Sequence, residues 1–201
     1  NVVLEGKIER DMIRAEAMGV RAMVHLDLLR LFAPSPKVND GKVYLPYVTK
    51  YPDPQPAYMT VEEVLDHIIT DLEFARQHLA FHDTTYNIYA INSESGRFHD
   101  GTTLTKGGLF FDIRGVRMNY FAASVLLARV YLYKGDKVNA LRCANDVYQY
   151  ATRKTWFKFT ASSNLGASNV DAIYRKMYED ILFAGFNQRL YDIYDQARES
   201  N

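Results

Sequence analysis

Aromatic side chains beside amides and basic groups are the residues of this sequence that could do chemistry. The chain contains 15 Tyr, 11 Phe and 1 Trp, together 13% of its residues, which is more rings than core filling needs. Trp156 stands in an alternating aromatic and basic run, TRKTWFKF. An exposed ring there could bind a sugar, because ring faces pack on axial C–H groups while amides and carboxylates bond the hydroxyls. The alternative is a ring packed under the following loop.

A second group of candidate ligand-binding residues lies in an insertion between two helical patterns. Residues 80–115 lose the helical period and gain Gly, Asn, Ser and Thr, which predicts loops and short extended pieces such as a hairpin. The polar and aromatic residues of this insertion could bind a ligand in the same way as Trp156, or they could pack within it. They are Tyr86, Asn87, Tyr89, Asn92 and Arg97.

Residue types that support catalysis or bind metals occur here without the required spacing. The sequence has no GxSxG, no GxGxxG opening a helix, no Walker loop and no pair of cysteines. His78 and His82 share the spacing of a helical zinc site but lack the glutamate of HExxH, so we expect a solvated pair. Cys143, the only cysteine, is expected to be a buried small hydrophobe. We therefore predict a protein that is not an enzyme and needs no cofactor or metal.

Charge and hydropathy exclude several classes of protein. The 201 residues include 24 Lys and Arg against 24 Asp and Glu, so no basic field exists to attract nucleic acid. Hydrophobic residues make 48% and charged residues 24%, which is typical of globular proteins. The longest apolar run, residues 121–133, is too short for a bilayer span and contains Ser124 and Arg129. It predicts a buried helix.

Helices are the elements that must position the candidate residues. Apolar periodicity predicts helices over 8–32, 61–79, 117–133, 137–151 and 188–198. The first helix carries two apolar stripes, which predicts packing on two sides, and it ends before Pro34. Residues 33–59 hold all six prolines and are expected to form an extended surface loop, while Thr60 and Glu63 form a capping box. We expect one all-α domain of antiparallel helix pairs with long decorated loops.

The predicted helix pair over 117–151 has the spacing of a tetratricopeptide repeat. Leu127, Ala128 and Tyr131 occupy the positions where that repeat carries Leu, Gly and Tyr. The second-helix positions are filled by Ala140, Ala144 and Val147. Small residues let the helices approach closely while the tyrosine fills the space between them. Any antiparallel helix hairpin with small contact residues would share this pattern.

Other segments resemble the SusD/RagB family. The stretch RAEAMGVRAMVHLDLLRLFA, residues 14–33, is similar to the hallmark helix of that family, although Ala33 replaces its usual glycine. The matching residues are Glu16, Ala17, Arg21, Ala22, Leu28, Arg30 and Phe32. Residues 60–79 resemble its next helix through Asp71, Leu72 and Ala75, and EDILFAG, residues 179–185, resembles its later E-x-I-x-F segment. We expect the charged residues Glu16, Arg21, Asp27 and Arg30 to form structural ion pairs.

This resemblance implies a SusD-like lipoprotein on the outer membrane of Bacteroidetes-type bacteria. Such a protein would capture oligosaccharides, or peptides as RagB-like members do, for a SusC-like TonB-dependent transporter. It implies a longer protein, of which this chain is the tetratricopeptide-bearing portion without the N-terminal lipid anchor. In the proline-rich loop, Tyr47, Tyr51 and Tyr58 would contact the ligand or the transporter. The alternative function is a tetratricopeptide scaffold that binds a protein partner and no small molecule.

Overall fold

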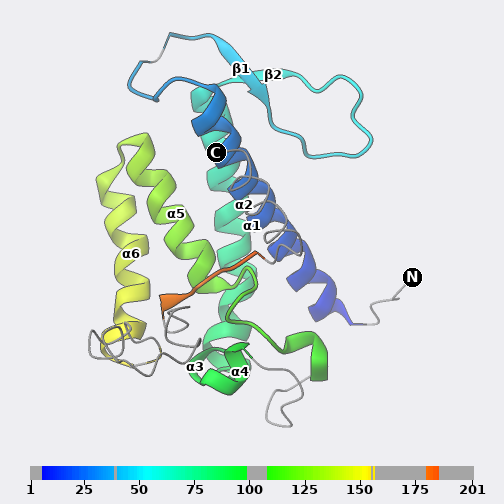
Figure 1. Cartoon of the computed structure of the whole chain (residues 1–201), viewed down its shortest axis with the longest axis vertical. Coiled ribbons are helices and arrows are strands. Elements are labelled where there is room, and N and C mark those ends of the chain that lie inside the picture. Colours follow the sequence, from blue (N-terminus) through cyan, green and yellow to red (C-terminus); the bar gives the residue numbers. More distant parts are fainter. Residues whose placement is uncertain (1–5, 39, 99–107, 155, 157–179, 186–201) are drawn as a thin grey trace, which may run out of the picture.

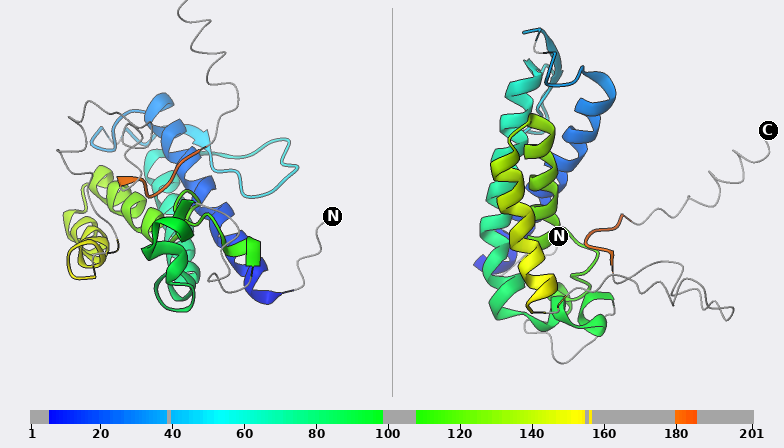
Figure 2. Two further views of the ribbon diagram at one scale, coloured as in Figure 1. Left: turned by 60° about the horizontal axis from the view of Figure 1, so that its bottom comes forward. Right: turned by 90° about the vertical axis from the view of Figure 1, so that its left-hand side faces the viewer.

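Four long helices make up most of the described structure. The computed structural model describes residues 6–38, 40–98, 108–154, 156 and 180–185. The long helices are α1 (Lys7–Phe32), α2 (Val61–Phe81), α5 (Tyr120–Lys134) and α6 (Lys137–Thr152). Helix α1 packs on α2, α2 on α5 and α5 on α6, so they form two antiparallel pairs in one array (Figures 1 and 2). The mostly helical fold class is confirmed, as are the first four predicted helices. The helix predicted over 188–198 lies outside the described residues.

Local side-chain contacts explain where the helices begin and end. The predicted capping box is present, since Thr60 Oγ1 accepts from Glu63 N at 3.3 Å and Glu63 Oε2 accepts from Thr60 N at 2.8 Å. Helix α5 begins three residues later than predicted because Asn119 is its N-cap and accepts from the first two peptide N–H groups that follow Tyr120. Gly135, with a φ of 92°, ends α5 in the left-handed conformation.

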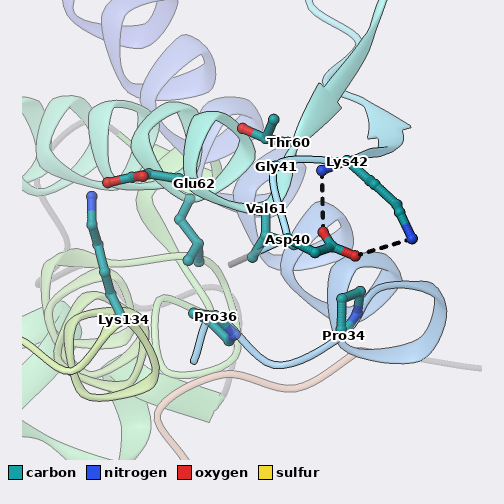
Figure 3. Close-up of a pocket in the computed structure, with 10 residues that line it drawn as sticks. Pro34, Pro36, Asp40, Gly41, Lys42, Thr60, Val61, Glu62 and Lys134 are labelled. Carbon is teal, nitrogen blue, oxygen red and sulfur yellow. Dashed lines mark hydrogen bonds and ion pairs between the residues drawn. The ribbon is translucent and has the colours of Figure 1, made fainter. Parts of the chain in front are cut away.

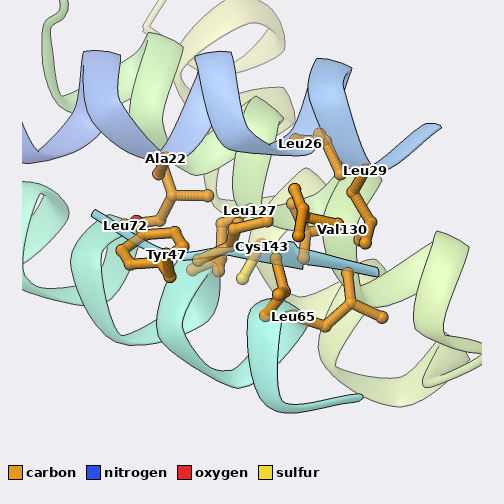
Figure 4. Packing of buried hydrophobic residues seen from close by; sticks show 12 residues of the cluster. Ala22, Leu26, Leu29, Tyr47, Leu65, Leu72, Leu127, Val130 and Cys143 are labelled. Atoms are coloured by element: carbon orange, nitrogen blue, oxygen red, sulfur yellow. The ribbon is translucent and has the colours of Figure 1, made fainter. Parts of the chain in front are cut away.

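The main hydrophobic core lies between α1, α2 and α5 (Figure 4). Its fully buried members include Leu29, Leu65, Leu72, Leu127 and Val130. Burying each such side chain contributes about 1.5–3 kcal/mol. Cys143 of α6 is also buried in this cluster, as predicted. In the described part of the chain, no helix is both long and apolar enough to cross a bilayer.

The outer side of α1 differs from the prediction of packing on two sides. One apolar stripe of α1 is buried and includes Met12, Ala15, Ala22, Leu26 and Leu29. The second stripe lies on the opposite side of the helix and remains partly exposed, as Val24 at 46% and Leu31 at 73% show. Packing on one side only is therefore observed for the described structure.

The proline-rich segment contains a small hairpin in place of a wholly irregular loop. Strand β1 (Val43–Pro46) pairs antiparallel with β2 (Tyr58–Thr60), with Leu45 opposite Met59. The connecting residues 47–57 extend sideways from one end of the bundle (Figure 1). Sequence analysis missed these strands because they are short and flank a proline-rich segment, and proline cannot donate to a strand ladder.

The described residues of the insertion, 80–98 and 108–115, form helical turns, so the expected hairpin is wrong for them. A π-helical turn, η1 (His82–Tyr86), continues α2, and two short helices follow, α3 (Tyr89–Asn92) and α4 (Glu94–Phe98). A 3₁₀ turn, η2 (Gly108–Phe111), comes before α5. Hydroxyl groups hold these turns: Thr84 Oγ1 donates to Ala80 O at 2.7 Å, and Ser93 Oγ donates to Tyr89 O at 2.8 Å. These hydrogen bonds from side chains to the backbone stabilise helical turns where the sequence predicted short extended pieces.

Candidate ligand-binding surface

A buried ion network fixes the insertion to the bundle. Asp83 of η1 accepts two hydrogen bonds from Arg114, from Nε at 3.0 Å and from Nη2 at 2.8 Å. Arg114 also donates to Glu16 of α1, which accepts from Arg117 Nη2 at 2.8 Å as well. Burial alone would lower the pKa of Arg114, but Asp83 and Glu16 raise it above its usual value. The network joins α1, η1 and the segment before α5, and Glu16 has the structural role that was predicted.

An exposed pair of aromatic rings lies where α2 passes into η1. The rings of Phe81 and Tyr86 stack at a centroid distance of 5.8 Å and an angle of 29°. Phe81 is 58% and Tyr86 39% exposed. They are five positions apart in the chain, and the wide π-helical turn brings such residues to one side. We call Phe81 and Tyr86 the aromatic platform.

His82 supports the aromatic platform from inside. Its ring meets Phe81 edge-on at 5.5 Å and Tyr86 edge-on at 5.6 Å, and it stacks on Phe111 at 6.0 Å. Burial lowers the pKa of His82, with a smaller contribution from Arg114, and Asp83 opposes the shift. The imidazole is therefore neutral near pH 7. This burial corrects the prediction that His78 and His82 form a solvated pair.

Metal binding has no support in this region. His78 stacks on Phe74 with ring centroids 3.8 Å apart, while His82 packs on Phe111. Across the residues that the structure describes, no group of three or more His, Cys, Asp and Glu side chains could hold a metal ion.

Trp156 packs beside α6 and is half-buried. Its backbone N–H donates to Tyr150 O at 3.2 Å, and its ring centroid lies 4.8 Å from that of Tyr150 and 6.1 Å from that of Phe121. The ammonium group of Lys154 lies 4.6 Å from the ring centroid of Tyr150 and 5.1 Å from that of Trp156. Phe121 belongs to a small cluster that includes Ile91 of α3. The structure thus brings Trp156 and the insertion to one cluster. Sequence analysis did not single out Tyr150, whose ring contacts that of Trp156.

The other predicted residues of the insertion have different environments. Asn92 is exposed and Tyr89 is half-buried, both on α3. Arg97 is only 5% exposed, donates to the backbone oxygen of Ile181 and lies 4.7 Å from the ring centroid of Phe98. Asn87 is 4% exposed. The guanidinium group of Arg97 ties α4 to the segment around residue 181, and the ligand contact of Arg97 stays a prediction.

The three tyrosines of the proline-rich segment separate into one core residue and two surface residues. Tyr47 is 5% exposed, and its hydroxyl donates to Asp71 Oδ2 at 2.5 Å. Burial raises the pKa of Tyr47, as does its hydrogen bond to Asp71. Tyr47 packs in the main core with residues of α1 and α2, and its contact with a partner stays a prediction. Tyr51 and Tyr58 are 98% and 63% exposed.

Asp71 organises this part of the core. It accepts from Arg21 Nε at 2.7 Å and from Arg21 Nη2 at 2.8 Å, in addition to the Tyr47 hydroxyl. Tyr47 lies between His25 and His67, with ring centroids 4.2 and 5.1 Å away. The predicted structural role of Arg21 is thus observed. Asp27 and Arg30 pair with each other, at 3.6 Å on the surface of α1.

A pocket of about 130 Å³ lies at the opposite end of α2 from the aromatic platform (Figure 3). Its lining residues are Pro34, Pro36, Asp40, Gly41, Lys42, Thr60, Val61, Glu62, Leu65 and Lys134. Several of its charges already have partners in the chain. Asp40 accepts from Lys42 N at 3.1 Å, and Lys134 donates to Asp66. The pocket therefore indicates no particular ligand class. Sequence analysis could not find it, because four separate segments form it.

Comparisons with known proteins support the family resemblance through the fold. No family model and no curated protein matches the sequence. A protein from Bacteroides vulgatus, to which sugar binding is ascribed, is 25% identical, with a TM-score of 0.51 over 76% of this chain. A SusD superfamily protein from Bacteroides thetaiotaomicron is 20% identical, with a TM-score of 0.56 over 82% of this chain. The chain spans 28% and 30% of the lengths of these two proteins. The chain thus shares the helical fold of these two proteins, one of which is a SusD superfamily protein.

Proposed function

We propose that this chain is the helical part of a cell-surface lipoprotein that binds glycans. In this proposal the protein captures oligosaccharides at the outer membrane of a Bacteroidetes-type bacterium, for uptake through a SusC-like TonB-dependent transporter. The observation that carries the proposal is the exposed stack of Phe81 and Tyr86 on a SusD-like scaffold. The sugar binding ascribed to the Bacteroides vulgatus protein supports the same ligand class.

The aromatic platform has the properties that a sugar-binding surface needs. Two stacked rings offer an apolar surface for the C–H groups of a pyranose ring. The support beneath them is rigid, because His82 packs on Phe111 and the neighbouring Asp83 is bonded to Arg114. A rigid platform loses little conformational entropy on binding. Capture would involve binding and no bond cleavage.

Further contacts would come from other residues at this end of the bundle. Tyr89 and Asn92 of α3 follow the platform in the chain, and Trp156 shares a cluster with α3. The amide of Asn92 is exposed and could bond sugar hydroxyls, while the partly exposed Trp156 could pack on a further sugar unit. A shallow surface of this kind leaves many hydroxyls in water, so we expect modest affinity.

Contact with the transporter is assigned to the loop between β1 and β2. This loop extends away from the bundle (Figure 1) and carries Tyr51, which is 98% exposed. Tyr58, which begins β2 directly after the loop, is 63% exposed. Tyrosine is enriched among the residues that dominate binding energy at protein interfaces. The platform and this loop lie at opposite ends of α2, so the protein could hold a ligand and a transporter together.

A protein-interaction scaffold without a small ligand is the second candidate function. The exposed side of α6 favours it, because Val138 is 80% and Leu141 is 70% exposed there. Capture of peptides, as in RagB-like proteins, is a variant of the first function and would use the same aromatic platform.

Calorimetric titration against plant, host and microbial oligosaccharides and short peptides tests the proposed function. We expect an oligosaccharide to bind the wild type, and we expect the double variant Phe81→Ala, Tyr86→Ala to lose that binding at least tenfold. Tyr148→Ala is a matched control, since Tyr148 is a 59% exposed tyrosine on α6 and is not part of the platform. If only peptides bind, the result supports RagB-like capture of peptides. If neither oligosaccharides nor peptides bind, the result contradicts capture.

A further inference from the structure

Ring side chains of α2 continue from the aromatic platform toward the middle of the helix. Phe74, His78 and Phe81 are spaced four and three residues apart, so they lie on one side of α2. The rings of Phe74 and His78 stack at a centroid distance of 3.8 Å and an angle of 23°, and both residues are half-buried. Phe81 of the platform lies about 10 Å from Phe74 along the helix axis. Ring surfaces therefore extend beyond the platform along this side of α2.

Arg14 of α1 lies beside this row of rings. Its guanidinium carbon is 5.0 Å from the ring centroid of Phe74, which is a cation–π contact. Helices α1 and α2 run antiparallel and touch at Gly19, where an added Cβ would lie 3.5 Å from the Cβ of Ala75. Because the two helices rise equally per residue, the backbone of Arg14 is about level with Phe81. We call the residues Phe74, His78 and Arg14 the platform extension.

The positive charge of Arg14 is not balanced by a carboxylate. In the part of the chain that the structure describes, no acidic side chain pairs with Arg14, Arg10 or Lys7. These three exposed residues follow one side of α1 at intervals of three and four. Arg21, the next basic residue along that side, is instead bonded to Asp71. The guanidinium group of Arg14 is thus open to an anionic ligand.

Three acidic residues in the same part of α1 do not cancel this charge. Glu16 pairs with the buried Arg114. Glu9 acts on the other side of the helix, where it raises the pKa of the buried His82 against the larger effect of burial. Asp11 is half-buried and carries one negative charge. The three cations exceed that single carboxylate, so the surface beside the rings is positively charged.

His78 supplies a hydrogen-bond acceptor within the platform extension. Its Nδ1 lies 2.9 Å from the backbone oxygen of Phe74. A carbonyl oxygen can only accept, so Nδ1 carries the hydrogen and donates it. In the neutral ring, Nε2 then keeps its lone pair and can accept from a sugar hydroxyl. The extension therefore combines ring faces, an acceptor and a cation.

We propose that the aromatic platform and its extension bind an acidic oligosaccharide, with the carboxylate of a uronic acid unit on Arg14. This inference rests on the proposed glycan-binding function. The rings would pack on the C–H faces of the sugar, and Nε2 of His78 would accept from a hydroxyl. Two N–H groups of Arg14 would donate to the two carboxylate oxygens, a planar pairing that is stronger than a hydrogen bond between neutral groups. A neutral sugar in the same place would make no such pair.

Calorimetric titration with a uronic acid oligosaccharide and with its carboxyl-reduced counterpart tests this inference. The two ligands have the same chain of sugar rings and differ in the carboxylates. We expect the wild type to bind the acidic ligand about tenfold more tightly at low salt, because hydrogen bonds between charged groups are the stronger ones. Raising the ionic strength to about 0.5 M should narrow this difference, since salt screens exposed charges.

Variants of Arg14 show which residue reads the carboxylate. Arg14→Gln should remove the preference for the acidic ligand and leave the affinity for the reduced ligand unchanged. Arg14→Lys keeps the charge without the planar fork, so it should keep only part of the preference. Arg30→Gln is the matched control, because Arg30 is also an exposed arginine of α1, and it should bind both ligands as the wild type does. Circular dichroism checks that each variant is folded.

The outcomes separate this inference from the function on which it rests. Equal affinity for the acidic and the reduced ligand would overturn the inference, as would a preference for the acidic ligand that survives Arg14→Gln. Glycan capture would still stand in either case if Phe81→Ala, Tyr86→Ala loses both ligands. If the wild type binds neither these ligands nor any other oligosaccharide, glycan capture itself fails, and the inference fails with it.

Discussion

Replacing Asp83 by Asn should destabilise the protein far more than the same change at a surface ion pair. Asp83 is 1% exposed, and its two oxygens accept from Arg114 at 3.0 and 2.8 Å. Oδ2 also accepts from the backbone N–H of Tyr120 at 2.8 Å. Removing one partner of a buried ion pair costs about 3–5 kcal/mol. Because Glu16 still neutralises part of the Arg114 charge, we expect about 3 kcal/mol.

Thermal and urea unfolding followed by circular dichroism measure this effect. For a chain of this size, about 3 kcal/mol corresponds to a fall in Tm of roughly 6–12 °C. Asp27→Asn makes the same chemical change at a surface pair with Arg30, whose N···O distance is 3.6 Å and whose side chains are 43% and 57% exposed. We expect that control to cost less than about 1 kcal/mol. If Asp83→Asn costs as little as Asp27→Asn, the buried network does not hold the insertion in place.

Three further changes test other parts of the structure. Burial lowers the pKa of His82 below its usual 6.5, so the unfolded chain binds more protons than the folded chain as the pH falls below that value. The free energy of unfolding should therefore fall as the pH falls from about 6.5. Urea titrations at about pH 5–7.5 should show that His82→Asn weakens this dependence. Tyr47→Phe should cost about 1–2 kcal/mol, because Asp71 loses the buried hydroxyl but keeps Arg21, and a Tm equal to that of the wild type would contradict the buried hydrogen bond. Gly135→Ala should cost about 1–2 kcal/mol through its φ of 92° alone, since no atom lies within 4 Å of the added Cβ; an unchanged unfolding midpoint would show that the turn adapts freely.

The long helices could be predicted from the sequence because their signals are local. Apolar residues recur at helical spacing in α1 and α2, and the capping box at Thr60 marks where α2 starts. Two of the segments that resemble the SusD/RagB family, residues 14–33 and 60–79, lie on these same helices, so the fold class followed from local patterns as well. The start of α5 was misplaced because the prediction followed apolar content and passed over the N-cap at Asn119.

The aromatic platform could not be predicted, because a π-helical turn creates it. In an α-helix, residues five apart lie about 140° from each other around the axis, so Phe81 and Tyr86 would face different sides. The wider turn of η1 removes that difference. Tyr86 was still a candidate from its composition, but Phe81 had no signal that separated it from a core residue at the end of α2.

Burial of predicted surface residues depends on contacts between distant segments. Tyr47 bonds to Asp71, which lies 24 residues away, and Arg97 bonds to Ile181, which lies 84 residues away. Neither contact leaves a pattern in the local sequence. Composition therefore identified the right kind of residue in these loops, and tertiary structure decided which of them reach the surface.

Mapping an oligosaccharide onto the folded chain by NMR tests the central claim most directly. Backbone amide shifts are followed while the tightest-binding glycan is titrated, and saturation transfer reports which protein rings touch the sugar. The account predicts shifts centred on residues 81–92 and saturation transfer that depends on Phe81 and Tyr86. Shifts confined to Thr60, Glu62 and Lys134, which line the pocket at the other end of α2, would contradict it.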